Sequence, residues 1–177
     1  MLVERESVPV QDRWNVEALY PYSDSWTREF EVIQGDPKSP QWPHIESYKG
    51  RLGEGADTLA KALEEILFVD RKLTRLYTYA HLRHDEDLAE QVNKERYEKI
   101  TALCYLFKQQ TAWFDPEVLS LSQEKIDSFL NEPVLKDHAL ALQRIVRKKA
   151  HTLDTKQEEL LALSGQALDT AQKAFSA

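Results

Sequence analysis

The sequence predicts an all-α fold made of helical hairpins, with two long antiparallel helices at its centre. The chain has 177 residues and only 5 glycines, and it is rich in Leu, Ala, Glu and Lys, which favour helices over tight-turned β structure. Apolar residues recur at spacings of three and four, the period of an amphipathic helix. With 42% hydrophobic and 30% charged residues, the composition is that of a folded protein. We therefore expect residues 1–177 to form a single helical domain.

The first third of the chain is expected to hold short elements. Residues 1–12 lack a helical period and are predicted to form an extended arm. Asn15 can cap a short turn that Pro21 stops. The next helix is predicted over residues 26–34, with Ser23 or Ser25 as its N-cap and Gly35 after its end. A further short helix is expected over residues 44–48.

Two long helices should follow. The first is predicted from Asp57 to about Asp85, with an apolar stripe that only Asp70 interrupts. A carboxylate on such a stripe needs a partner, and Arg75 or an arginine on another helix could supply one. The second helix is predicted over residues 88–113. The link between them is short enough to require an antiparallel helical hairpin.

The last third should be helical as well. Asp115 and Pro116 could open a single turn. Ser122 can cap a helix over residues 123–130, and Pro133 can start another that runs to about Lys149. The final helix is expected to open with a T-x-x-E capping box formed by Thr155 and Glu158. It meets no Gly or Pro stop signal, so we expect the natural polypeptide to continue beyond Ala177.

Charge and composition argue against several classes of protein. The net charge of −7 repels phosphate, so we expect no nucleic-acid partner. A short basic patch is interpreted as the solvated C-terminus of a helix; it comprises Arg144, Arg147, Lys148 and Lys149. The N-terminus lacks the apolar stretch of a signal peptide, and no segment is apolar enough to cross a membrane. The single cysteine, Cys104, is interpreted as a small core residue, and a cytoplasmic location is expected.

No complete catalytic motif is present in the sequence. A zinc peptidase of the H-E-x-x-H type needs two histidines four residues apart with a glutamate as base, and none of the 5 histidines fits this pattern. There is also no G-x-S-x-G elbow, P-loop, G-x-G-x-x-G or cysteine pair. We therefore predict neither catalytic nor metal-binding residues within residues 1–177.

One cluster of polar residues, around His81, His84 and Asp85, remains to be interpreted. Helical spacing places these three side chains on one face, where they could bind zinc or another divalent ion. The simpler interpretation is that the histidines cover a neighbouring helix and that Arg83 or His84 offsets the acids at the helix C-terminus. Tyr77 and Tyr79 are spaced by two, so at most one of them should lie in the core.

Three segments of the chain together resemble the oligoendopeptidase F family, a branch of the thimet-oligopeptidase-like zinc metallopeptidases. They are RWNVEALYP near the start, YKGRLGEGADTLAKALE with LYTYAHLRHDED over residues 48–87, and HTLDTKQEELLALSGQAL over residues 151–168. The three strings occur in the family's order and spacing, and the resemblance covers almost the whole chain.

The resemblance implies an N-terminal helical lid or wall over the substrate channel of a zinc metalloendopeptidase that hydrolyses oligopeptides. The family's zinc ligands lie far beyond residue 177, so zinc is expected outside this chain, and the chain alone is expected to be inactive. Its implied partners are the C-terminal catalytic domain and oligopeptide substrates. Four aromatic residues are candidates for an exposed face that meets this domain: Trp42, Tyr79, Trp113 and Phe114. The alternative is an independent helical module that binds a partner helix.

Overall fold

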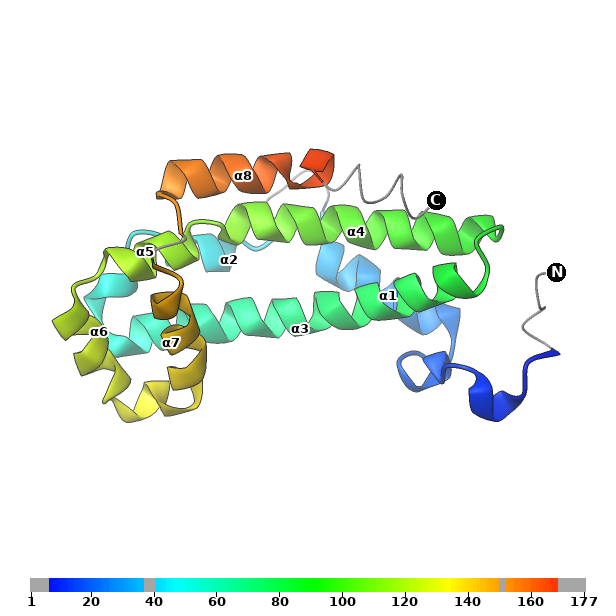
Figure 1. The fold of residues 1–177 in the computed structure, drawn as a ribbon, viewed down its shortest axis with the longest axis horizontal. Helices are drawn as coiled ribbons and strands as arrows, with labels where there is room; N and C mark the ends of the chain where they lie inside the picture. Colours follow the sequence, from blue (N-terminus) through cyan, green and yellow to red (C-terminus); the bar gives the residue numbers. More distant parts are fainter. Residues whose placement is uncertain (1–6, 37–40, 150–151, 169–177) are drawn as a thin grey trace. The chain divides into compact units, whose positions relative to one another are not determined.

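The computed structural model describes residues 7–36, 41–149 and 152–168, and every regular element in these ranges is helical. Figure 1 shows the elements in chain order. The α-helices are α1 (Ser23–Gln34), α2 (Pro43–Glu46), α3 (Ala56–Glu86), α4 (Gln91–Thr111), α5 (Phe114–Ser120), α6 (Gln123–Leu130), α7 (Ala139–Arg147) and α8 (Thr155–Leu168). Short 3-10 turns lie at η2 (Val10–Asp12), η3 (Val16–Ala18), η4 (Leu52–Glu54) and η5 (Pro133–His138). The predicted all-α class is confirmed.

The chain divides into two compact units. The first unit comprises Met1–Gln41 and Asp70–Cys104, and the second comprises Trp42–Val69 and Tyr105–Ala177. The long helices α3 and α4 each contribute residues to both units. Among the described residues, none of the helices is long and apolar enough to pass through a lipid bilayer.

In the first unit, the C-terminal part of α3 and the N-terminal part of α4 form the predicted antiparallel hairpin (Figure 1). Helix α1 is attached to α3 by Trp26, whose indole Nε1 donates a hydrogen bond to the carbonyl oxygen of Leu76 at 2.9 Å. The ring of Trp26 stacks on Phe30 with centroids 5.0 Å apart. Both rings are buried, so their apolar area and one satisfied indole N–H hold α1 against the hairpin.

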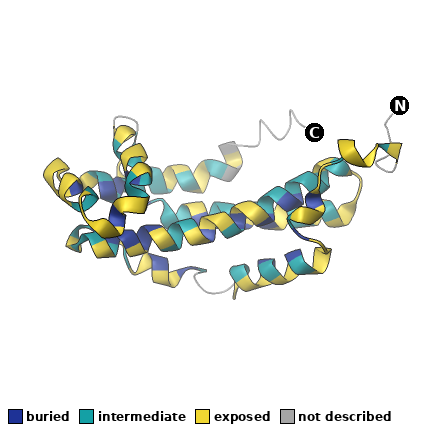
Figure 2. Ribbon diagram, turned by 90° about the horizontal axis from the view of Figure 1, so that it is seen from below, coloured by how far each residue is buried: buried dark blue, intermediate teal, exposed yellow. Residues whose placement is uncertain are grey.

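In the second unit, the core forms around aromatic residues. Trp42 meets Phe107 edge to face at 4.8 Å, and Trp113 meets Phe114 in the same way at 5.8 Å. Leu135 and Leu142 bring η5 and α7 to this core and are 0% and 2% exposed. Figure 2 shows buried positions along the long helices.

The expected exposed aromatic face is wrong. Trp42, Tyr79, Trp113 and Phe114 are 3%, 2%, 2% and 4% exposed, because these large rings satisfy the cores of their own units. Tyr79 is buried and Tyr77 only half-buried, which confirms that at most one of this pair lies in the core.

Asp70 also departs from the prediction. Its side chain is exposed, so it needs no buried partner. Arg75 instead lies 3.7 Å from Glu29, and its Nη2 donates to the carbonyl oxygen of Leu19 at 2.5 Å. The buried stripe of α3 passes through Val69 and Leu73, at the spacing that 3.6 residues per turn requires. Asp70 therefore lies beside the stripe and is exposed.

Helix ends follow local chemistry with small shifts from the prediction. The hydroxyl of Ser122 accepts a bond from the amide of Lys125, as expected of the N-cap of α6. The predicted capping box of α8 lies one residue earlier. Asp154 accepts from the amide of Gln157 at 2.9 Å, and Gln157 accepts from the amide of Asp154 at 3.3 Å. Glu158 accepts instead from the amide of Leu153 at 2.9 Å.

Other boundaries differ more from the prediction. Pro133 starts a 3-10 turn, not an α-helix, and α7 begins only at Ala139. Helix α5 begins at Phe114, so Asp115 lies inside its first turn. Val10–Asp12 form a 3-10 turn within the predicted extended arm, and residues 1–6 of that arm lie outside the described residues. The prediction of a single domain stays a prediction.

A carboxylate on α5 fixes the loop before α3. Glu117 Oε2 accepts a hydrogen bond from the amide of Gly50 at 2.7 Å, and Glu117 Oε1 accepts one from the amide of Leu52 at 2.8 Å. Gly50 has φ +80°, a left-handed conformation that favours glycine. Leu52 is fully buried, so the two bonds position a core side chain as well as the loop.

Replacement of Glu117 by Ala is expected to destabilise the chain by about 2–3 kcal/mol, because two charge-assisted hydrogen bonds are lost and one amide is left partly buried. Chemical unfolding measures this difference. Glu46→Ala removes an exposed glutamate of the same unit and should change the free energy of unfolding by less than about 0.5 kcal/mol. Equal effects of the two substitutions would contradict the role assigned to Glu117.

Candidate functional site

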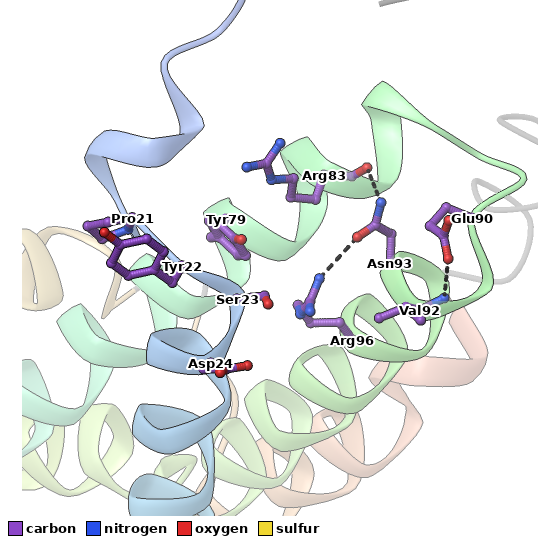
Figure 3. Close-up of a pocket in the computed structure, with 10 residues that line it drawn as sticks. All are labelled: Pro21, Tyr22, Ser23, Asp24, Tyr79, Arg83, Glu90, Val92, Asn93 and Arg96. Atoms are coloured by element: carbon purple, nitrogen blue, oxygen red, sulfur yellow. Dashed lines mark hydrogen bonds between the residues drawn. The ribbon is translucent and has the colours of Figure 1, made fainter.

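A polar hollow of about 710 Å³ lies in the first unit, where α1 begins and the hairpin of α3 and α4 turns. Figure 3 shows the side chains around it. They combine two guanidinium groups, two carboxylates, an amide, hydroxyl groups and a few apolar surfaces; the lining residues are Pro21, Tyr22, Ser23, Asp24, Tyr79, Arg83, Glu90, Val92, Asn93 and Arg96.

Arg83 ties one wall of the hollow to the N-terminal segment. Its Nη2 lies 2.8 Å from Glu17 Oε1, and its Nη1 lies 3.0 Å from Glu86 Oε2. Burial lowers the pKa of Arg83, but hydrogen bonds with Tyr79, Glu17 and Glu86 outweigh that effect and raise the pKa above its ordinary value. The guanidinium therefore stays charged, and its pair with Glu86 offsets an acid at the C-terminus of α3, as the sequence suggested.

Arg96 projects from α4 into the same region. Its Nη1 donates to Asn93 Oδ1 at 3.0 Å, and its guanidinium carbon lies 5.3 Å from the ring centre of Trp26 and 5.8 Å from that of Tyr79. Asn93 in turn donates to the carbonyl oxygen of Arg83 at 3.1 Å, which joins α4 to the end of α3 (Figure 3). Aromatic faces on its flanks restrict the arginine, so it is pre-organised to meet a polar or anionic group.

The two histidines of the predicted cluster pack on a tyrosine and lie outside the lining of the hollow. His81 and His84 lie 5.3 Å and 5.2 Å from the ring centre of Tyr97, and His81 stacks on Tyr77 at 5.6 Å. The hydroxyl groups of Tyr77 and Tyr97 are 3.1 Å apart. The histidines thus cover the neighbouring helix, as the simpler interpretation predicted.

A metal site at this cluster finds no geometric support in the described part of the chain. His81 Nδ1 lies 3.7 Å from Asp85 Oδ2, and no group of three or more His, Cys, Asp or Glu side chains gathers among the residues described. A zinc centre needs three or four protein ligands. The described residues therefore do not fit a zinc ion.

The N-terminal segment meets α3 through a second arginine. The hydroxyl of Tyr20 donates to Glu29 Oε2 at 2.9 Å, and the guanidinium carbon of Arg75 lies 4.4 Å from the ring centre of Tyr20. Tyr20 also meets Tyr79 edge to face at 5.2 Å. The RWNVEALYP and LYTYAHLRHDED strings, far apart in sequence, are therefore neighbours in the first unit.

Sequence reasoning selected the histidines of this region and missed Arg96, Glu17 and Asn93. These residues lie on other helices or turns, and no local spacing connects them to Arg83. The one available signal was the need for a cation near the acids at the end of α3, which identified Arg83 itself. Two predictions concern other parts of the chain. The basic patch of Arg144, Arg147, Lys148 and Lys149 is exposed at the end of α7, as expected. Cys104, predicted to be a small core residue, is only half-buried.

Comparison with known proteins gives a consistent result. Residues 117–177 match a family model described as Oligopeptidase F. Oligopeptidase PepF of Bacillus subtilis is 32% identical over 176 residues, which are 99% of this chain and 26% of the relative. The plasmid-encoded oligoendopeptidase F of Lactococcus lactis subsp. cremoris is 29% identical over 99% of this chain and 29% of its own length.

Solved structures agree. The crystal structure of oligoendopeptidase-F from Enterococcus faecium superposes with a TM-score of 0.73 at 29% identity, over 88% of this chain and 28% of that chain. A solved structure from Chlamydophila abortus gives a TM-score of 0.76 at 31% identity, over 99% of this chain and 29% of the other. This chain thus spans less than a third of the length of these relatives.

The fold and the matches together indicate the class of protein: the chain resembles the helical N-terminal region of bacterial oligopeptidases. More particularly, the chain is similar along 99% of its length to a member of the oligoendopeptidase F family.

Alkaline pH is expected to destabilise the chain partly through Tyr20. Burial raises the pKa of its hydroxyl well above the ordinary value, and the hydrogen bond to Glu29 raises it further. The folded state therefore holds this proton more tightly than the unfolded state. The resulting stability is fully present below about pH 10, the ordinary tyrosine pKa, and is lost as the pH rises above it.

Tyr20→Phe removes this ionisation, so its free energy of unfolding should fall less steeply above about pH 10 than that of the unchanged chain. Urea unfolding across the alkaline range measures the slope. Tyr22→Phe is the control, because that side chain is 74% exposed, and it should keep the original slope. An unchanged slope in Tyr20→Phe would contradict the assignment.

Titration of the chain with zinc is expected to give no heat of binding that depends on His84. The ring of His84 stacks on Tyr97, and the described residues supply too few ligands around it. Calorimetric titration of the chain and of His84→Ala should give the same curve. His44→Ala serves as the control for an exposed histidine outside the cluster. Binding that disappears only in His84→Ala would establish the metal site instead.

Proposed function

We propose that this chain is the N-terminal region of a zinc metalloendopeptidase that hydrolyses oligopeptides in the cytoplasm, and that it forms part of the wall of the substrate channel. The observation that carries the proposal is the similarity along 99% of the chain to proteins named oligopeptidase or oligoendopeptidase, each of which is more than three times as long. The rest of the relatives' length leaves room for a catalytic part outside this chain.

The zinc ion belongs to that other part under this proposal. The described residues do not fit a zinc ion, and the sequence lacks H-E-x-x-H. The contribution of this chain is then steric and electrostatic. Rigid helices limit which substrates can enter, so that short flexible peptides pass and folded proteins are excluded.

The polar hollow is the part of this chain best suited to meet a peptide. Arg96 offers N–H donors for a carbonyl or carboxylate, and Asp24 and Glu90 offer acceptors for an amide or ammonium group. The ion pairs of Arg83 with Glu17 and Glu86 hold the wall in place. These groups bind and orient, and they include no pair of a nucleophile and a base in hydrogen-bond contact among the described residues that line the hollow.

The proposal predicts that residues 1–177 cleave no peptide, whereas a longer form encoded by the same gene cleaves an internally quenched oligopeptide. A chelator should abolish that cleavage, and zinc should restore it. Turnover by residues 1–177 with zinc would overturn the proposal. So would a stop codon after Ala177 with no peptidase encoded beside it, which would favour an independent module that binds a partner helix.

A further inference from the structure

The large apolar residues of helix α8 lie on its solvent-exposed side, which is unusual for a helix on a protein surface. Its half-buried positions carry small or charged side chains: Thr155, Glu158, Glu159, Ala162 and Gly165. Three of its leucines are exposed instead: Leu160, Leu161 and Leu163 are 63%, 47% and 60% exposed. A helix on the surface of a complete domain turns its apolar stripe toward the core. This arrangement is the reverse.

The inner face of α8 is fixed by specific contacts, so the helix cannot simply rotate to bury its leucines. A Cβ at Gly165 would lie 3.4 Å from Tyr105 Cε1, which shows how closely the helix approaches α4 there. Lys49 Nζ lies 2.7 Å from Glu159 Oε1. Helix α5 also packs against α8. Rotation would break the ion pair and bring a bulky leucine side chain against the ring of Tyr105.

The exposed leucines form a continuous surface. Leu160 and Leu163 are three positions apart and therefore adjacent on the helix, and Ala167, four positions further, is exposed on the same side. Leu153, just before the helix, is 46% exposed. Contiguous apolar side chains of this kind are typical of a surface that another part of a protein covers. We call Leu160, Leu163 and Ala167 the outer face of α8.

We propose that the outer face of α8 docks against the part of the oligoendopeptidase fold that follows this region in the relatives, so that its occupant is a further segment of the same polypeptide. The inference rests on the proposed function and specifies which surface joins the two parts. The length of the relatives supports it: this chain spans 28% of the Enterococcus faecium chain, and α8 lies within the segment that matches the family model.

Hydrogen–deuterium exchange on α8 tests the docking. The amides of α8 should exchange at least about tenfold more slowly in the longer form of the protein than in residues 1–177, because a covered helix opens less often. The double substitution Leu160→Ser with Leu163→Ser should remove that protection in the longer form and change the exchange of residues 1–177 by less than about twofold. Leu140→Ser, on α7, is the matched control because Leu140 is 57% exposed, and it should leave the protection intact.

Two results would overturn the docking. One is equal exchange of α8 in the two forms. The other is dimerisation of residues 1–177 in sedimentation that the double substitution abolishes, because the occupant would then be a second copy. Peptidase activity of the longer form is measured separately: an active enzyme with unprotected α8 contradicts the docking alone, and an inactive protein with protected α8 contradicts the proposed function alone.

Discussion

Burial of one side of α3 is the constraint on which both units depend. In the second unit this helix contributes Leu59, Ala60, Ala62, Leu63 and Val69 to the core, and in the first it contributes Leu73, Leu76, Tyr79 and Ala80. The surrounding elements attach to it by different means. Trp26 adds a hydrogen bond to a carbonyl oxygen of α3, whereas His44 and His138 approach Glu65 and Glu64 at 3.2 Å and 3.3 Å. A single helix therefore supplies the apolar surface that orders most of the short elements.

The sequence predicted the elements whose signals are local. The all-α class, the hairpin, the N-cap at Ser122 and the end of α1 at Gly35 each depend on neighbours within a few positions. The helix boundaries that differ from the prediction also have local causes. The capping box of α8 is displaced to Asp154 and Gln157 because an aspartate and a glutamine can form the same reciprocal bonds as a threonine and a glutamate.

Predictions that required tertiary knowledge failed more often. Trp42 was expected at an interface because its packing partner, Phe107, lies far from it in the sequence and meets it only in the folded chain. The sequence also does not indicate that Leu160, Leu161 and Leu163 of α8 lie on its exposed side. The hollow shows the same limit: Arg83 could be anticipated from the acids at its helix end, but Arg96 and Glu17 come from other elements and carry no pattern.

The contact of Glu117 with the amides of Gly50 and Leu52 has a consequence for the order in which the chain acquires its structure. The partners are 67 and 65 residues apart, so closing this contact has a large loop-entropy cost. During synthesis, α3 and α4 must leave the ribosome before the carboxylate becomes available. Until then the loop before α3 lacks these two bonds, so the second unit can be completed only after both long helices have been synthesised.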